Sequence, residues 1–429
     1  MGLAEAIAYA KAHQPAIRTA MARIAARKSA ADVPRAAWLP RFGVTAQLFG
    51  ATANQTTASY VTVDVPDLPR IGGTRAVSKG TFRPYASTLA GIGANQEVFD
   101  FGRIAAEAAA ADALVDVERE RAASTALDVT FDVEEAYFAV FASKSIVQAS
   151  EDAYERARVH RDLAKAGVTA GLRPPIELTR AESELTKLDI GRMRARGNLA
   201  TAETVLAAVV GAPDSALDVA SSPPNPAEMP SLADAIERAS ARDPRLRAAL
   251  SELHAEEART RAIGASLRPD LSATGTFSGR AGGATPSSGP GADGSGFIPN
   301  VPNWDVGLVL TWPLFDGVVN ARESASRAEE QVRREEMDLV RQEDVAVVRE
   351  AYVAVDVARE ALPGLRRAVD AAKANYDQAD ARFRAGLGTS VELADAEALR
   401  TDADIQLALG QFELARARAA FGRSIAEGP

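Results

Sequence analysis

Few residues in this 429-residue chain have the type and spacing that chemistry requires. The three histidines, His13, His160 and His254, stand alone, without a second ligand at the spacing of a metal site, so packing or surface roles are favoured for them. The glycine clusters at 91–93 and 279–296 lack the Lys-Ser/Thr of a phosphate-binding loop. No Ser, His and Asp residues follow the nucleophile-elbow pattern. We therefore predict that the protein is not an enzyme and needs no metal or cofactor.

One pair of carboxylates offers a different chemistry. Glu392 and Asp395 stand three residues apart, just after the glycines Gly386 and Gly388, so they share one face of a new helix. Acidic residues in the first turn of a helix commonly do no more than complement its dipole. The alternative is a functional role, and the spacing alone leaves both interpretations open.

Composition narrows the class of protein further. A net charge of −9 argues against binding nucleic acid, which requires basic surfaces. No run of 18 apolar residues is present, so a transmembrane helix is excluded. The stretch from Leu3 to Lys11 has neither the basic nor the apolar region of a signal peptide, which indicates a cytosolic protein or a signal peptide replaced by a start codon. The absence of cysteine is a weak indication of an oxidising compartment.

The elements that must position any site are unusually long. Between Gly102 and Gly167 there is no proline and no internal glycine, and Ala, Glu, Arg, Val and Leu dominate. About 65 helical residues would span roughly 100 Å. No single globular core covers such a rod, so we expect it to lie against other helices of similar length.

The long helix belongs to a tandem repeat. Shifting the sequence by 215 positions lays Gly102 on Gly317 and Gly171 on Gly386, and a shift of 229 lays Pro15 on Pro244. The protein is therefore a duplication of one unit of helices and strands.

Two strands are expected in each repeat, because apolar residues alternate there with a period of two. Each strand has about the ten residues that cross a bilayer at a tilt, and aromatic residues lie near the strand ends. The alternative to membrane-spanning strands is a soluble β-hairpin domain with one face exposed to water. Four strands cannot close a barrel, whereas three chains would supply twelve strands and a closed one.

The predicted organisation has three parts. The first repeat, 1–211, holds helices within 3–39, strands 42–53 and 84–98, and a helix pair at 102–210. A proline-rich linker, 212–231, follows, with a short strand near Leu217 to Val219. The second repeat, 232–429, holds helices within 232–268, strands 271–280 and 304–314, and a helix pair at 317–425. We expect Pro363 and Gly364 to interrupt the second long helix and to kink or overwind it.

This organisation resembles the TolC family of outer-membrane factors, also called outer membrane efflux proteins. The segments from Val98 to Gly102 and from Pro313 to Gly317 are similar to that family's strand-to-helix junctions. The stretch from Arg382 to Leu393, followed by Ala396 and Glu397, is similar to its periplasmic tip. The resemblance covers Leu3 to Gly422.

The resemblance implies a mainly α-helical fold with a transmembrane β-barrel, in which the tandem-repeat protomer forms a trimer. The trimer would have a 12-stranded barrel in the outer membrane and its lipid, and a long α-helical barrel in the periplasm. Such a protein is a passive exit duct of a tripartite efflux pump. Its partners would be a periplasmic adaptor (membrane fusion) protein and an inner-membrane RND or ABC transporter. The alternatives are a type I protein secretion duct of the same family and a soluble helical scaffold protein.

The resemblance also assigns candidate site residues. An acidic ring at the entrance gate maps onto Glu392 and Asp395. In some members a tyrosine and an arginine hold the tunnel shut, and those places are occupied here by Phe383 and Gly388. Gate-adjacent candidates are therefore Phe383, Arg382, Arg384 and Arg173. The expected adaptor-docking tips are Ala170, Gly171, Leu172, Ala385, Gly386 and Leu387. The expected membrane-interface aromatics are Tyr85, Phe277, Trp304 and Trp312.

Overall fold

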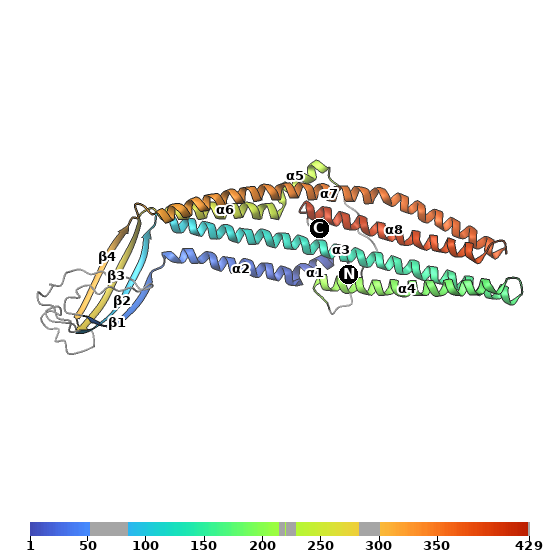
Figure 1. Ribbon diagram of the computed structural model, residues 1–429, viewed down its shortest axis with the longest axis horizontal. Coiled ribbons are helices and arrows are strands. Elements are labelled where there is room, and N and C mark those ends of the chain that lie inside the picture. The colour runs from blue at the N-terminus through green and yellow to red at the C-terminus, as the bar shows by residue number, and fades with distance from the viewer. Residues whose placement is uncertain (52–84, 214–218, 220–228, 283–300, 428–429) are drawn as a thin grey trace. The chain divides into compact units, whose positions relative to one another are not determined.

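The computed structural model describes residues 1–51, 85–213, 219, 229–282 and 301–427. The first repeat contains α1 (Leu3–His13), α2 (Pro15–Arg35), η1 (Ala36–Trp38), β1 (Arg41–Ala51), β2 (Tyr85–Phe99), α3 (Arg103–Thr169) and α4 (Pro175–Val210) (Figure 1). The second contains α5 (Leu232–Arg242), α6 (Pro244–Ala265), β3 (Asp270–Gly282), β4 (Val301–Thr311), α7 (Gly317–Arg384) and α8 (Ser390–Ser424). No helix among these residues is long and apolar enough to cross a membrane.

The chain divides into two compact units, and each takes segments from both repeats. Unit 1 comprises Met1–Ala25, Asp116–Leu250 and Glu335–Pro429, and unit 2 comprises Ala26–Val115 and Ser251–Arg334. Duplicated segments therefore pack together within a unit, and the two repeats do not form separate globules.

Unit 1 contains two equivalent hydrophobic cores, one from each repeat. In the first, Val133 and Val140 of α3 are fully buried against α1 and α4. In the second, Val348 and Val355 of α7 are fully buried against α5 and α8. The same shift of 215 positions relates these valines, so the duplication visible in the sequence is also a duplication of packing.

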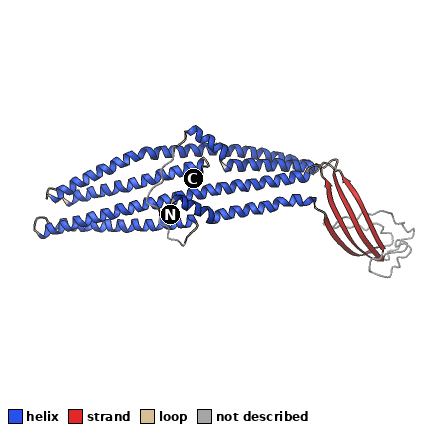
Figure 2. Cartoon of the chain, turned by 180° about the vertical axis from the view of Figure 1, so that it is seen from behind, coloured by secondary structure: helices blue, strands red, loops and turns tan. Residues whose placement is uncertain are grey.

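Unit 2 contains a four-stranded antiparallel sheet in the order β1-β2-β3-β4 (Figure 1), whose strands are drawn in red in Figure 2. One face is apolar, and its large side chains are exposed: Phe42, Val44, Leu48, Ile92, Phe277, Trp304, Val306, Leu308 and Leu310. The opposite face is polar and better covered, with Thr45 and Thr276 less than a tenth exposed. Among the described strands, β1 and β4 each have one edge without a partner strand.

Each strand pair leads into a long helix through an aspartate cap. Asp100 accepts hydrogen bonds from the backbone N–H groups of Gly102 (3.0 Å) and Ile104 (2.5 Å) at the start of α3. Asp316 accepts from Val318 (2.8 Å) and Val319 (3.2 Å) at the start of α7. The carboxylates satisfy N–H groups that have no partner within the helix, which explains why this junction begins both long helices.

Several predicted boundaries need correction. The strand predicted at 304–314 is β4, Val301–Thr311, so Trp312 follows the strand. The interruption predicted at Pro363 is wrong, because α7 is helical throughout and contains this proline. Beside it, a Cβ at Gly410 of α8 would overlap Leu365, and this close packing supports the helix where the proline removes a hydrogen bond. Residues 52, 53, 84, 217 and 218 of the predicted strands lie outside the described residues, and Val219 is not in a strand.

Candidate functional site

Two tight turns join the helices of unit 1 in pairs. Hairpin 1 is α3 and α4 with turn 1 (170–174), and hairpin 2 is α7 and α8 with turn 2 (385–389). Gly171 (φ +69°) and Gly386 (φ +73°) have the left-handed conformation that favours glycine. Leu172 and Leu387 each donate a backbone hydrogen bond of 2.9 Å to the carbonyl five residues earlier. Both turns are therefore Schellman motifs, and the sequence repeat preserves their geometry.

The predicted docking residues are exposed on these turns. Leu172 is 82% exposed and Leu387 is 75% exposed, and the preceding residues Ala170, Gly171, Ala385 and Gly386 are also exposed. Exposed leucines beside small residues form an apolar surface on which a helical partner could pack closely.

Below the turns, a buried carboxylate joins the two hairpins. Glu177 of α4 accepts a 3.0 Å hydrogen bond from the backbone N–H of Ser390 at the start of α8, and a second bond from the Ser390 hydroxyl. Arg173 lies 3.7 Å from the same carboxylate. Burial opposes ionisation, but the hydrogen bonds from Ser390 and the charge of Arg173 hold the pKa of Glu177 below its ordinary value. Glu177 is therefore ionised where it links α4 to α8.

Phe383 lies between the hairpins in a small apolar core. Its side chain is 1% exposed and packs with Ala164 and Ala181 of hairpin 1 and with Leu393 of α8. The Arg173 guanidinium lies 3.8 Å from the centre of its ring and donates a 2.5 Å hydrogen bond to its carbonyl oxygen. One arginine therefore makes both a cation–π contact and a hydrogen bond to the opposite hairpin.

His160 of α3 completes this buried group. Its ring lies 4.5 Å from that of Phe383 in an edge-to-face arrangement, and its Nε2 is buried without a hydrogen-bond partner. Burial and the nearby charge of Arg173 lower the pKa of His160. The histidine is therefore neutral at neutral pH, and its protonation would place a second cation beside Arg173.

A second set of contacts joins the hairpins further from the turns. Arg156 of α3 donates three hydrogen bonds of 2.8 to 3.1 Å to the carboxylate of Glu397 on α8. The guanidinium groups of Arg156 and Arg400 lie 5.5 Å and 4.9 Å from the centre of the Tyr376 ring of α7. Burial and the charge of Glu397 raise the pKa of Tyr376 to about 12. The ion pair is largely shielded from water, so its bidentate geometry makes it a strong constraint.

The predicted acidic pair, Glu392 and Asp395, is exposed, unlike the buried contacts between the hairpins. The side chain of Glu392 accepts a 3.4 Å hydrogen bond from the Thr389 backbone N–H, and the Thr389 hydroxyl accepts a 3.3 Å bond from the Glu392 N–H. This is a capping box, so the helix-start interpretation holds for Glu392. Asp395 is exposed one turn later. A role of both carboxylates in an entrance ring stays a prediction.

The predicted gate-adjacent arginines have different partners. Arg173 is the candidate that contacts the opposite hairpin. Arg384 forms a 2.7 Å ion pair with Asp380 of its own helix, and Arg382 donates a 3.4 Å hydrogen bond to Leu387 of its own turn. The structure therefore places Phe383 and Arg173 together, and Arg382 and Arg384 in local contacts.

The predicted interface aromatics belong to the sheet of unit 2. Phe277 and Trp304 lie opposite each other on β3 and β4 and are 60% and 74% exposed. Trp312, which follows β4, is 58% exposed. The side chain of Tyr85 lies outside the described residues. Exposed aromatic residues on an apolar sheet face suit contact with lipid.

Sequence reasoning missed Glu177, Ser390 and the pair of Arg156 with Glu397, and it set His160 aside. One signal was available for Glu177, because the shift of 215 positions places it on Glu392. The two glutamates begin equivalent helices, yet Glu177 is buried between the hairpins and Glu392 is exposed.

Comparison with known proteins supports the fold over almost the whole chain. The solved outer-membrane channel OprN superposes with a TM-score of 0.77 at 22% sequence identity, covering 99% of this chain and 90% of that one. CusC superposes with a TM-score of 0.78 at 15% identity, covering 99% and 92%. The open state of the MtrE outer membrane channel from Neisseria gonorrhoeae gives 0.75 at 18% identity, covering 99% and 89%. A search of curated protein sequences gives no significant match.

The family assignment follows from the sequence match. The profile of the family described as "Outer membrane efflux protein" matches residues 6–212 and 235–426. This match confirms the predicted fold class, the outer-membrane location with an extension into the periplasm, and the efflux-channel function, and it excludes the enzyme and soluble scaffold classes. Members of the family form trimeric channels. The chain belongs to the outer membrane efflux protein family, the TolC family.

Proposed function

We propose that three copies of this chain form the exit duct of a tripartite efflux pump. In each copy the sheet would supply four strands of a shared barrel. The assembly is inferred from the sheet of unit 2, which has two unpaired edges among the described strands and one exposed apolar face. Pairing β1 of one copy with β4 of the next would satisfy the edges and turn the apolar face toward lipid.

Mass measurement in detergent tests the assembly. The expected result is a complex of three chains whose integrity depends on the strand edges. Introducing Val44→Lys on the apolar face of β1 should prevent membrane insertion, whereas Gln47→Lys on the polar face of the same strand should allow it. A folded monomer in detergent would overturn the proposal.

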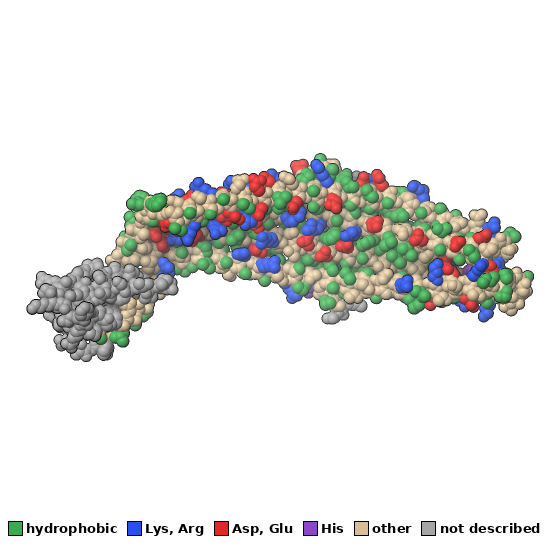
Figure 3. Space-filling view, viewed as in Figure 1, with side chains coloured by type: hydrophobic (Ala, Val, Ile, Leu, Met, Phe, Trp, Pro, Cys, Tyr) green, Lys and Arg blue, Asp and Glu red, His purple; other side chains and the backbone are tan. Residues whose placement is uncertain are grey.

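We further propose that the turns of hairpins 1 and 2 form the periplasmic entrance and dock an adaptor protein. Support comes from the two Schellman turns, which present Leu172 and Leu387 to the outside. On the face shown in Figure 3, acidic and basic side chains are interspersed with hydrophobic ones over both hairpins, so apolar contact is available there without a large area of one charge. The adaptor would in turn connect the duct to an RND or ABC transporter of the inner membrane.

The buried contacts below the turns would act as a latch for that entrance. We define the latch as Arg173, Glu177, Phe383 and Ser390, with Arg156 and Glu397 as its second part. Because the latch joins hairpin 1 to hairpin 2, moving the hairpins apart requires these contacts to break. A related channel, MtrE, has been solved in an open state, so an opening transition is reasonable for this fold. Crosslinking of the turns to an adaptor during active export would test the docking.

A further inference from the structure

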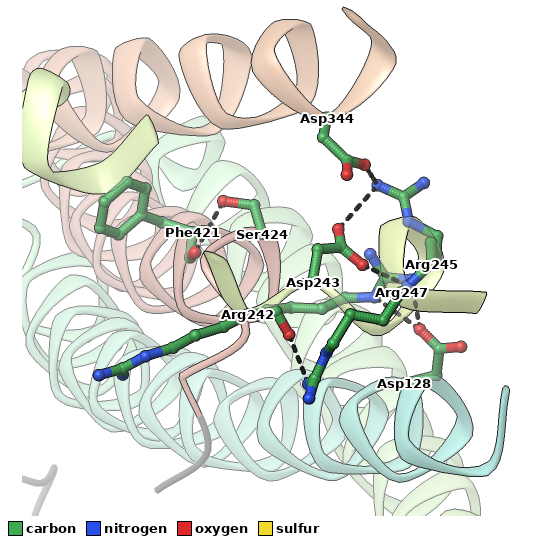
Figure 4. Close-up of polar contacts among 9 residues, drawn as sticks. Asp128, Arg242, Asp243, Arg245, Arg247, Asp344, Phe421 and Ser424 are labelled. Atoms are coloured by element: carbon green, nitrogen blue, oxygen red, sulfur yellow. Dashed lines mark hydrogen bonds and ion pairs between the residues drawn. The ribbon is translucent and has the colours of Figure 1, made fainter. Parts of the chain in front are cut away.

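A group of two buried carboxylates and one half-buried arginine connects the corner between α5 and α6 to α7 (Figure 4). Asp243 is the corner residue, and its carboxylate accepts a 2.7 Å hydrogen bond from the backbone N–H of Arg245. The Arg245 guanidinium lies 3.3 Å from Asp243 and also donates to Asp344 of α7. The side chains of Asp243 and Asp344 are 9% and 4% exposed. One cation is therefore shared by two buried carboxylates.

The geometry leaves one carboxylate oxygen unsatisfied. Oδ1 of Asp344 accepts from Arg245, but its Oδ2 is buried without a hydrogen-bond partner. A buried ionised carboxylate without a donor is costly, whereas a protonated one can itself donate. A hydrogen-bond interaction with Asp243 is among the causes that raise the pKa of Asp344.

The surrounding charged residues that the structure describes do not supply a second positive charge for these two carboxylates. On the corner, Arg247 lies 3.4 Å from Glu120 of α3 and donates to the carbonyl of Arg242 at 2.8 Å. On α8, Arg423 lies 2.5 Å from Asp128 of α3. On α7, the neighbouring Glu343 adds a further negative charge near Asp344. Two carboxylates and one arginine therefore remain together at the corner.

The first repeat shows what the fold itself requires at this place. The shift of 229 positions aligns Gln14 with Asp243 and Ala16 with Arg245. The shift of 215 positions aligns Val129 with Asp344. Val129 is buried in the first hydrophobic core, and Gln14 donates a 2.6 Å hydrogen bond to Val209. An uncharged corner is thus compatible with this packing, so the charged triad of the second repeat is an addition to the fold.

We propose that Asp243 and Asp344 share one proton at neutral pH, and that this proton clamps the α5–α6 corner to α7. Binding the proton leaves one negative charge opposite the one positive charge of Arg245. Releasing it to solvent leaves two negative charges opposite that arginine and removes the hydrogen bond between the carboxyl groups. The corner then separates from α7 as pH rises. Burial and the charge of Asp243 raise the pKa of Asp344 to about 7, which agrees with this arrangement.

Infrared spectroscopy of the detergent-solubilised full-length protein tests the shared proton. Asp344→Asn keeps the shape and can still donate to Asp243, but it has no proton to lose. We expect a carboxylic-acid C=O band in the wild-type protein that weakens by about half near pH 7 and is lost at higher pH. The same band should be absent from Asp344→Asn and retained in Glu343→Gln, which removes the neighbouring charge alone. An unchanged spectrum in Asp344→Asn would show that both carboxylates are ionised and would overturn the proposal.

Spin labels test the clamp. The chain contains no cysteine, so Ser240→Cys on α5 and Gln342→Cys on α7 give two unique labelling sites, and both positions are exposed. The distance between the labels should increase as pH rises from about 6 to about 8.5 in the wild-type background and stay constant in Asp344→Asn. A constant distance in both proteins would overturn the clamp.

A variant that carries the residues of the first repeat is the control for misfolding caused by the single substitution Asp344→Asn. Asp243→Gln, Arg245→Ala and Asp344→Val together reproduce the residues of the first repeat. We expect this variant to assemble as the wild type does and to show neither the infrared band nor the pH-dependent distance. A pH response that survives in this variant would place its origin elsewhere and overturn the proposal.

Discussion

The guanidinium of Arg173, in the turn of hairpin 1, lies 3.8 Å from the ring centre of Phe383 in hairpin 2 and donates a hydrogen bond to the carbonyl of the same residue. The two residues are 210 positions apart in the chain and belong to different repeats. This contact is therefore a direct physical connection between the two hairpins at the proposed entrance.

Removing that connection should favour the open entrance. Cation–π contacts contribute about 0.5 to 2 kcal/mol, so Arg173→Ala should increase the open population by about two- to thirtyfold. The measurement is single-channel conductance in a planar bilayer. Arg384→Ala is the matched control, because Arg384 pairs with Asp380 within α7. Equal conductance of the two variants would contradict the latch.

Glu177 should contribute to stability, whereas its repeat counterpart should not. Glu177→Gln weakens charge-assisted hydrogen bonds in a buried site and should cost about 1 to 3 kcal/mol of unfolding free energy. Glu392→Gln, at the exposed equivalent position, should cost about 0.5 kcal/mol or less because glutamine preserves the capping box. Denaturant unfolding of the detergent-solubilised protein measures both. Similar losses for the two variants would contradict the assignment.

The lowered pKa of Glu177 predicts how acid affects the stability of the protein. Because folding lowers the pKa of Glu177 below 4.5, its stabilisation is present above that pH and is lost as pH falls through the lower folded value. The wild type should therefore lose stability under strongly acidic conditions more steeply than Glu177→Gln. Melting temperatures of the two proteins across an acid series give this comparison, and parallel curves would contradict it.

His160 should make the entrance sensitive to milder acid. Its pKa is lowered from 6.5 in the folded protein, so the unfolded or opened state binds the proton more readily. Stabilisation is present above about pH 6.5 and is lost as pH falls toward the lower folded value. Conductance should therefore rise on mild acidification in the wild type and stay constant in His160→Phe. A rise of the same size in His160→Phe would exclude this histidine.

The two glycine turns should be required for export but not for assembly. Gly171→Val and Gly386→Val place a β-branched residue at positive φ, which costs about 1 to 2 kcal/mol locally and distorts the turn. We expect export to fail while trimers and membrane insertion persist. Gly171→Asn and Gly386→Asn are the controls, because asparagine tolerates this conformation. Export by the valine variants would place adaptor docking elsewhere.

Most elements of the fold could be predicted because their signals are local. The long helix α3 follows from a composition without proline or internal glycine, α7 follows from the sequence repeat that relates it to α3, and the strands follow from alternation with a period of two. The strand β4 begins at Val301, three residues before the predicted start, and contains Pro302. Proline is tolerated there because it lies one residue from the start of β4, where the pairing with β3 ends.

The candidate site was less accessible to sequence reasoning. Arg173 could be named because it lies beside a recognisable turn. Glu177 and Ser390 are 213 positions apart, and Arg156 and Glu397 are 241 positions apart. Such pairs depend on how the two hairpins lie against each other, and spacing within a single helix contains no information about that.

The difference between Glu177 and Glu392 has a consequence for whatever docks at the turns. In the proposed trimer, the starts of α4 and α8 alternate around the rim and give six sites of similar backbone geometry. Only every second site would expose its glutamate, because Glu177 is buried and Glu392 is exposed. A partner built from six identical arms would therefore contact two chemically distinct kinds of site, one with its glutamate buried and one with its glutamate exposed. The six arms would therefore bind in two different ways. They would be arranged around the ring as three pairs.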